Sequence, residues 1–199
     1  MKSLVYRILW LITWPFVNLV YPRRTTGREH VAGLEGAALI CANHSSMIDP
    51  FLIAYSIGIK HQIHYMGKAE LFRIPVIGSL LRAAGIFPVD RQGGGATAIK
   101  GAMKFLKDGE KVGIFPEGTR VYTEAESEAK TGAVRLAAKM GVPIVPVYLP
   151  REKKILRLNR VVIGAPYMVE LDKKPEPEDV ERAAEELMAK IRALGDLDQ

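Results

Sequence analysis

Two residues that could share acid–base chemistry lie five positions apart in ANHSSMIDPF, residues 42–51. A histidine imidazole ordinarily titrates at about pH 6.5, so His44 could remove the proton of an alcohol as a general base. A helical spacing of five would turn Asp49 away from His44, so the pair requires the loop to curl back. The carboxylate would then fix the imidazole tautomer and stabilise the imidazolium. Asp49 and Pro50 also fit a helix start, with aspartate as N-cap and proline at the first helical position.

The other polar residues of this stretch are weaker candidates for chemistry. Ser45 and Ser46 adjoin the histidine in sequence and lie outside any G-x-S-x-G turn, so we expect them to shape or cap the loop. Cys41 belongs to the apolar run GAALICAN and is expected to be a small buried hydrophobic residue, not half of a Cys–His pair.

Two further loops carry arginines in matching positions. Arg91 ends the run IFPVDR, and Arg120 ends IFPEGTR. Because a planar guanidinium suits bidentate phosphate recognition, this pair is predicted to clamp an anionic headgroup. Glu117 could accept a hydrogen bond from a substrate hydroxyl or orient an arginine, and Gly118 would let the backbone approach a substrate closely.

Short apolar runs alternate with helical patterns after Arg28, and these elements must position the loops. The expected strands lie within residues 36–43, 61–67, 86–91, 111–118, 142–149 and 160–171, and the expected helices within 49–58, 69–85 (divided at Pro75), 96–109, 131–141 and 175–194. This alternation predicts a single α/β domain with a largely parallel or mixed sheet flanked by helices. Loops at the carboxyl ends of the strands would carry the site. Two prolines in residues 142–149 place that strand near a sheet edge or at its ends.

The N-terminal segment, residues 1–26, is distinct from the α/β domain expected over residues 27–199. It is apolar from Leu4 to Tyr21 but broken at Pro15, and a membrane-spanning helix needs about 20 consecutive apolar residues. Its tryptophans and tyrosines favour the headgroup level, so we expect a helical segment, one helix or two, that lies in one leaflet. A buried core helix is the alternative.

Composition narrows the partners and the setting. With 28 basic and 22 acidic residues the net charge is +6, which suits an anionic membrane surface, acidic small molecules or nucleic acid. A single cysteine excludes an internal disulfide and points to a reducing, cytoplasm-facing setting. A basic cluster lacks the aromatic pattern of nucleic-acid binding, so it is expected to be solvated, to meet anionic lipid or to dock an acidic carrier protein. Its members are Arg151, Lys153, Lys154, Arg157 and Arg160.

These loops resemble four blocks of the glycerolipid acyltransferase family, in the family's order. The first is Asn43-His44 with Asp49 five positions after the histidine, and the second is GIFPVDR, ending at Arg91. The third, FPEGTR, covers residues 115–120, and the fourth is the apolar VPIVPV, residues 142–147. One block alone would be a weak signal, but four in order are specific.

The resemblance implies transfer of a fatty acyl group from acyl-coenzyme A or an acyl carrier protein to the free sn-2 hydroxyl of lysophosphatidic acid. The product would be phosphatidic acid, made at the cytoplasmic face of the cell membrane by a monotopic or peripheral protein. His44 would be the base and Asp49 its partner, with direct attack, no acyl-enzyme, and no metal or bound cofactor. The implied substrate-binding residues are Arg91, Glu117, Gly118, Thr119, Arg120 and Lys68, with Lys130 as a weaker candidate.

Three alternatives stay open at this point. The acceptor could be another lysophospholipid, an aminolipid or glycerol 3-phosphate, and the two arginines favour an acceptor that carries a phosphate monoester. Water could replace the alcohol, which would make a thioesterase. A non-catalytic lipid- or nucleic-acid-binding module would leave the four blocks unexplained.

Overall fold

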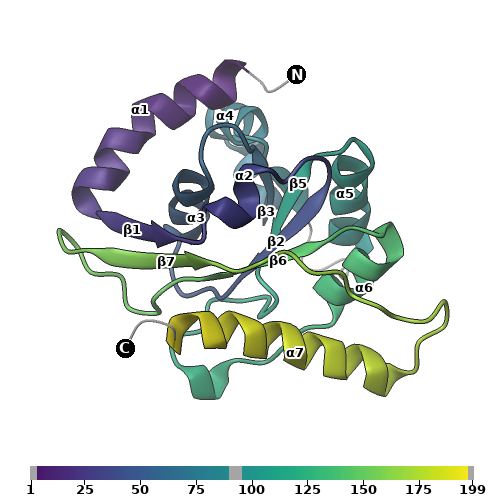
Figure 1. Cartoon of the computed structure of the whole chain (residues 1–199). Helices are drawn as coiled ribbons and strands as arrows, with labels where there is room; N and C mark the ends of the chain where they lie inside the picture. The colour runs from purple at the N-terminus through teal and green to yellow at the C-terminus, as the bar shows by residue number, and fades with distance from the viewer. Residues whose placement is uncertain (1–3, 90–95, 197–199) are drawn as a thin grey trace.

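The computed structural model describes residues 4–89 and 96–196, and in them seven strands form one mixed sheet (Figure 1). The strand order is β1-β7-β6-β2-β5-β3-β4, and every neighbouring pair is parallel except β6 and β7. The strands are β1 (Arg23–Thr26), β2 (Ala38–Ala42), β3 (Ile63–Lys68), β4 (Phe87–Val89), β5 (Lys111–Ile114), β6 (Ile144–Tyr148) and β7 (Asn159–Ile163). The expected α/β class with a mixed sheet is confirmed.

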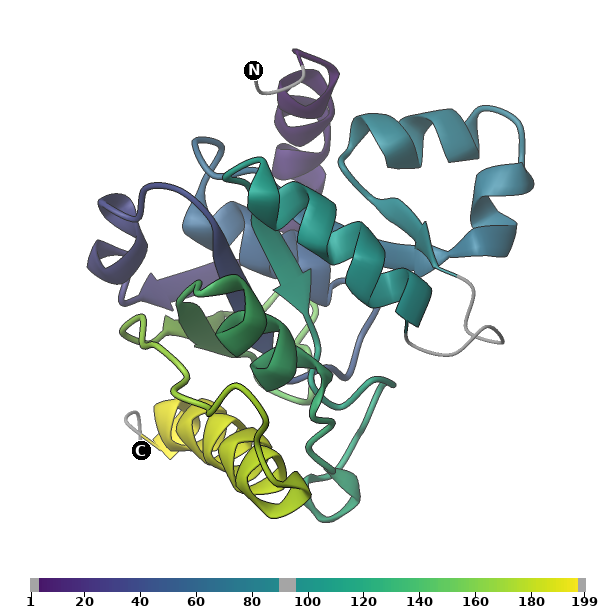
Figure 2. The same ribbon diagram turned by 90° about the vertical axis from the view of Figure 1, so that its right-hand side faces the viewer.

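Helices cover both faces of this sheet, which is why its central strands are apolar throughout. On one face lie α5 (Ala96–Lys107), α6 (Gly132–Met140) and α7 (Pro177–Asp196), seen in front of the sheet in Figure 2. The other face carries α1 (Leu4–Val20), α2 (Glu29–Ala32) and α3 (Asp49–Ile57). Side chains alternate along β2, so Leu39 and Cys41 pack with the first group while Ile40 and Ala42 pack with the second.

The remaining described elements are short. The segment between β3 and β4 forms η1 (Ala69–Arg73) and α4 (Ile77–Ala83), which confirms the predicted division at Pro75. A further turn, η2 (Glu124–Glu126), lies in the connection between β5 and α6. Helix α6 ends at Gly141, whose φ of 62° is the left-handed conformation that glycine adopts without strain.

The prolines suggested a strand near an edge or prolines at its ends. The edge is wrong, because β6 lies between β7 and β2, but Pro143 does lie at the end, directly before the strand. Ile144 exchanges backbone hydrogen bonds with Tyr167, so it faces the β7 side of the strand. Pro146, two residues further, faces the same side and accepts a hydrogen bond from Gly164, just past the end of β7. The N–H that Pro146 lacks would point toward β7 at a position before the β6–β7 ladder begins. The hydrogen bonds between β6 and β2 are therefore not interrupted.

The N-terminal segment folds as one helix, α1, with Pro15 inside it. Its contact with α3 includes a hydrogen bond of 2.5 Å between the Thr13 and Tyr55 hydroxyls. Residues 23–26, which the sequence groups with this segment, form the edge strand β1 of the sheet. Helix α1 leaves a row of large apolar side chains exposed, yet no helix in residues 4–89 and 96–196 is long and apolar enough to cross a membrane.

Candidate active site

Three loops meet at the carboxyl edge of the sheet and build the candidate site. His44 follows β2, Glu117 follows β5, and Lys153 lies in the connection from β6 to β7. Because β2, β5 and β6 are parallel neighbours, their carboxyl ends share one edge of the sheet. The loops are tied by backbone as well, since Val121 N–H donates to the His44 carbonyl at 2.7 Å.

The loop after β2 curls back and brings His44 and Asp49 into contact, as the acid–base hypothesis requires. The His44 Nδ1 atom lies 3.0 Å from Asp49 Oδ2. An ionised carboxylate only accepts hydrogen bonds, so Nδ1 carries the proton and Nε2 has a free lone pair. The imidazole stacks on Phe115 with 4.0 Å between ring centroids, and 18% of its side chain is exposed. His44 is thus oriented and still reachable from solvent.

Asp49 is the centre of the loop and not a helix N-cap, contrary to the sequence expectation. It is the first residue of α3, and its carboxylate points back into the loop, where Oδ2 accepts the Ser45 and Ser46 amides at 2.8 Å each. Its other oxygen, Oδ1, lies 2.7 Å from Lys153 Nζ. Burial alone would raise the pKa of Asp49, but the His44 bond, the Lys153 charge and the Ser46 amide lower it below the ordinary aspartate value.

Ser45 has the structural role expected of it. Its hydroxyl donates to the Arg151 carbonyl at 2.6 Å and lies 2.6 Å from Lys153 Nζ. It is buried, so it supports the loop and does not attack a substrate. Cys41 is fully buried in the core, and burial raises the pKa of its thiol.

Glu117 is buried beneath the histidine loop with both carboxylate oxygens engaged. Oε2 accepts the His44 backbone N–H at 2.6 Å, and Oε1 accepts Arg151 Nη2 at 2.6 Å and the Ser127 hydroxyl at 2.7 Å. Of the two roles that the sequence left open, the structure shows the second, because Glu117 orients an arginine. That arginine is Arg151, which was not among the predicted site residues.

Arg151 and Lys153 are the site residues that sequence reasoning missed. Arg151 also binds Glu124, with Nε 2.6 Å from Oε1, and donates Nη1 to the Val121 carbonyl at 2.9 Å. The Lys153 side chain is 5% exposed, although the sequence places it in a basic cluster expected to be solvated. The sequence did contain one signal for these two residues. Arg151 and Lys153 come soon after the apolar strand β6, whose carboxyl end lies at the edge of the sheet that carries the site.

An amide clamp fixes the two strands that carry these residues. Asn43 donates Nδ2 to the Leu149 carbonyl at 2.7 Å and accepts the Leu149 N–H at 2.9 Å through Oδ1. Both residues are buried, so the pair replaces the backbone ladder where β2 and β6 have ended. The Asn43-His44 sequence thus combines an anchor and a reactive side chain.

Of the predicted substrate-binding residues that the structure describes, Glu117 is buried and the others are exposed. Gly118, Thr119 and Arg120 form an exposed turn after β5, and Lys68 is exposed at the end of β3, on the same edge of the sheet. Gly118 has φ +72°, a conformation that other residues rarely adopt. Lys130 pairs with Glu128 at 2.7 Å on the surface. Arg91 lies outside the described residues, two positions after β4 ends.

A family model described as "Acyltransferase" matches residues 22–150, about two thirds of the chain. The chain belongs to the acyltransferase family. The match covers the loops of His44 and Glu117 and ends one residue before Arg151, so the polar support of the site from residues 151–153 lies just beyond it.

Named relatives of this acyltransferase chain agree with the family assignment. The chain is similar to the 1-acyl-sn-glycerol-3-phosphate acyltransferase of Bacillus subtilis, with 37% identity over 84% of this chain and 85% of the relative. A Streptococcus pneumoniae protein of the same name is 30% identical over 98% of this chain and 71% of its own length. The crystal structure of the 1-acyl-sn-glycerophosphate (LPA) acyltransferase PlsC from Thermotoga maritima shares the fold, with TM-score 0.69 and 21% identity over 96% of this chain and 79% of that one.

Proposed function

We propose that this protein transfers a fatty acyl group from a thioester to the sn-2 hydroxyl of lysophosphatidic acid, as the names of its relatives indicate for them. The donor would be acyl-coenzyme A or an acyl carrier protein. The alcohol oxygen bonds to the thioester carbonyl carbon, the carbon–sulfur bond breaks, and the thiol leaves. Phosphatidic acid, a precursor of phospholipids, is the lipid product.

The observation that carries this proposal is the His44–Asp49 contact at the carboxyl edge of the sheet. With Nδ1 bonded to the carboxylate, Nε2 accepts the alcohol proton as the oxygen attacks, and the imidazolium then returns that proton to the departing thiolate. Asp49 stabilises the imidazolium, and Lys153 holds the carboxylate from its other oxygen. Direct attack by the alcohol is part of this proposal: Ser45 and Cys41 are buried, and the Ser46 hydroxyl lies within the loop, where it accepts the Ile48 N–H at 3.4 Å.

The acceptor phosphate would bind at the exposed side of the same edge. Arg120, Thr119 and the Gly118 backbone line the turn after β5, and Lys68 ends the neighbouring strand β3. Arg91, two positions after β4 ends, would complete a cationic clamp. Glu117 holds the histidine loop from below, so its contribution to substrate binding is indirect.

Helix α1 would place this site at the cytoplasmic face of the membrane. Leu4, Leu11, Phe16 and Leu19 are each more than 60% exposed, which is unusual for apolar side chains and typical of a helix that lies in one leaflet. The acceptor and product are membrane lipids, so a peripheral or monotopic attachment gives the enzyme access to both.

The decisive experiment follows thiol release and lipid products when purified protein meets lysophosphatidic acid and each donor. The expected result is acceptor-dependent formation of phosphatidic acid, reduced at least about a hundredfold in His44→Ala because the general base is lost. Free fatty acid formed without an acceptor would instead identify a thioesterase. Full activity in His44→Ala would exclude the proposed base.

A further inference from the structure

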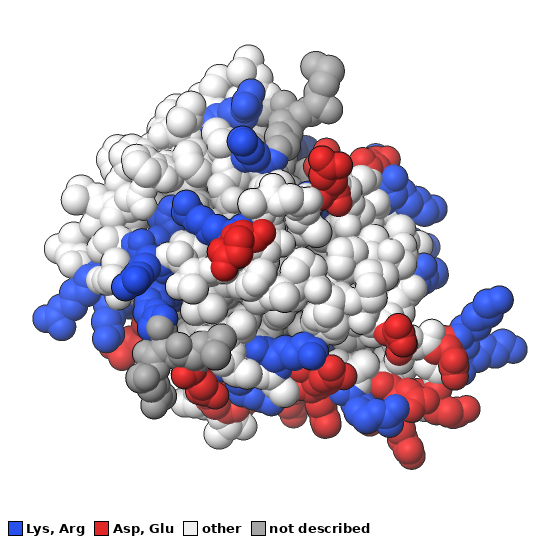
Figure 3. Space-filling model, in the orientation of Figure 1, with Lys and Arg blue, Asp and Glu red and all other residues white. Residues whose placement is uncertain are grey.

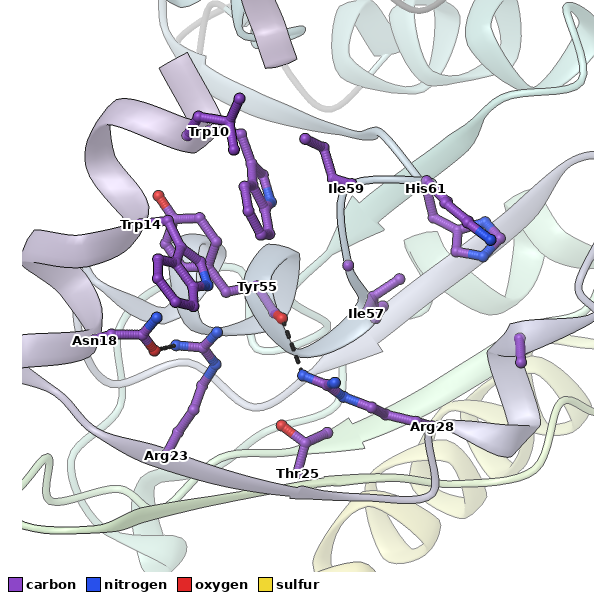
Figure 4. A pocket seen from close by; sticks show the side chains of 14 residues that line it. Trp10, Trp14, Asn18, Arg23, Thr25, Arg28, Tyr55, Ile57, Ile59 and His61 are labelled. Atoms are coloured by element: carbon purple, nitrogen blue, oxygen red, sulfur yellow. Dashed lines mark hydrogen bonds between the residues drawn. The ribbon is translucent and has the colours of Figure 1, made fainter. Parts of the chain in front are cut away.

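A cavity with both apolar and polar lining lies away from His44, between α1, α3 and β1, with a volume of about 930 Å³ (Figure 4). His44 precedes the first residue of α3, whereas Tyr55 and Ile57 border the cavity at the other end of that helix. A nine-residue helix is about 13 Å long, so the cavity and the candidate active site are separate.

Two arginines face this cavity, and neither pairs with a carboxylate of residues 4–89 or 96–196. Arg23 donates to the Asn18 side chain at 2.6 Å and lies 5.1 Å from the centre of the Tyr55 ring, but its Nε–H is buried without a hydrogen-bond partner. Arg28 makes one long hydrogen bond, 3.4 Å, to the Tyr55 carbonyl. Burial and the nearby charge of Arg28 lower the pKa of Arg23 to about 10.

The remaining wall of the cavity combines aromatic, aliphatic and basic side chains. Trp10 and Trp14 enter from α1, stacked at 6.2 Å, and His61 lies on the opposite side (Figure 4), while Lys60 also lines the cavity. Among the residues that line it, all within the described part of the chain, there is no aspartate or glutamate. Arg23 is half-buried with its Nε–H unpartnered, and Arg28 is exposed, so the two guanidinium groups keep hydrogen-bond capacity and charge that an anion from outside the protein can satisfy.

The position of the cavity decides which anion is suitable. Leu11, exposed on α1, also lines it, so its rim continues into the apolar surface that we place on the membrane. In Figure 3 the surface over α1 is nearly free of charge, and a group of basic side chains lies below it with a small acidic area beside it. Tryptophans prefer the headgroup level of a bilayer.

We infer that Arg23 and Arg28 form a binding site for the phosphate of an anionic phospholipid headgroup, separate from the active site. The lipid chains would leave along the exposed face of α1 while the phosphate meets the two guanidinium groups. Such a site would hold the enzyme on anionic membranes and fix the angle of α1. It rests on the proposed membrane placement of α1, which neutral vesicles test separately.

The test is co-sedimentation with phosphatidylcholine vesicles that contain or lack phosphatidylglycerol, at low salt and at about 0.5 M sodium chloride, where surface charges are screened. Arg23→Gln and Arg28→Gln are compared with Arg24→Gln, a matched control because Arg24 alternates to the exposed side of β1. Each loss of surface charge alone should weaken anionic-vesicle binding by about fivefold at low salt. A bound headgroup predicts a further loss of at least about tenfold in Arg23→Gln and Arg28→Gln only, which persists at high salt.

Other outcomes would exclude the headgroup site, assign it to a free anion, or reject the membrane placement of α1. Equal losses in all three variants would indicate diffuse charge attraction, and no loss in Arg28→Gln would exclude the site even if Arg23→Gln were unstable. Calorimetric binding of inorganic phosphate that depends on Arg28, without any effect on vesicles, would assign the cavity to a free anion. Absence of binding to neutral vesicles would reject the placement of α1. His44→Ala should bind all vesicles normally, so failure of the catalytic proposal is a distinguishable result.

Discussion

Lys153 Nζ and His44 Nδ1 contact opposite oxygens of one carboxylate, with Asp49 Oδ1 2.7 Å from the lysine and Oδ2 3.0 Å from the histidine. The lysine comes from a loop more than 100 residues away in the chain. The aspartate is fully buried, so each contact limits how the carboxylate can rotate. His44 therefore takes its orientation from two loops.

Lys153→Met should reduce turnover by between about tenfold and a hundredfold, because a carboxylate freed on one side misplaces the imidazole. Loss of the lysine charge raises the pKa of Asp49 and leaves its negative charge to stabilise the imidazolium more strongly, so the acid limb of the rate profile should move to higher pH. Steady-state kinetics over a pH series measure both effects. Lys154→Met, at the exposed neighbouring position, is the control. A uniform drop in rate with an unmoved acid limb would contradict the positioning role.

Arg151→Met should lower the free energy of unfolding by about 3 kcal/mol, because it leaves the buried carboxylate of Glu117 without its cation. Urea denaturation followed by circular dichroism gives the value. The matched change Arg182→Met breaks an exposed pair with Asp179 and should stay within about 0.5 kcal/mol. If both variants lost a similar free energy of unfolding, the buried Arg151–Glu117 pair would stabilise the fold no more than an exposed pair does.

The stability contributed by Asp49 should depend on pH in a defined direction. Its pKa is lowered in the folded protein, whereas an unfolded aspartate titrates at about pH 4. Folding therefore favours the ionised form, and this contribution is complete above about pH 4 and lost as the pH falls through the lower folded value. The stability difference between wild type and Asp49→Asn, measured by urea unfolding, should be largest near neutral pH and shrink on acidification. A difference that grows toward low pH would contradict the assigned direction.

Arg120→Ala should raise the KM for lysophosphatidic acid by about tenfold or more, because a charge-assisted contact with the phosphate is lost. The KM for the thioester should change little. Arg135→Ala, an exposed arginine on α6, controls for the change in net charge. If the two variants gave the same acceptor KM, Arg120 would be removed from the phosphate clamp.

Most elements of the fold could be predicted from the sequence, since their signals are local. The division of the β3–β4 segment at Pro75 and the end of α6 at Gly141 follow from the restricted backbone angles of proline and the permissive ones of glycine. Strand position was not predictable in this way. The β6 prolines suggested an edge, yet the strand lies inside the sheet, where Pro146 still accepts the Gly164 N–H and its missing N–H precedes the β6–β7 ladder.

Asp49 illustrates the same division within the site. The Asp-Pro pair correctly predicts where α3 begins, but a single sequence cannot show which way a carboxylate points at a helix start. Here the curled loop offers two amides and an imidazole, and Lys153 adds a cation, so the side chain turns back from the helix.

The sequence by itself determined the chemistry, because histidine, aspartate and arginine types at loop positions after apolar strands limit what the site can do. Only the tertiary structure decided which distant residues hold the reactive side chains in place. Residues 151–153 reach the site only because β6 lies beside β2, and the arginine pair of the cavity beside α1 forms only because α1 packs over β1 and α3. Local patterns record backbone preferences and polarity, whereas partners distant in the chain are fixed by which strands become neighbours.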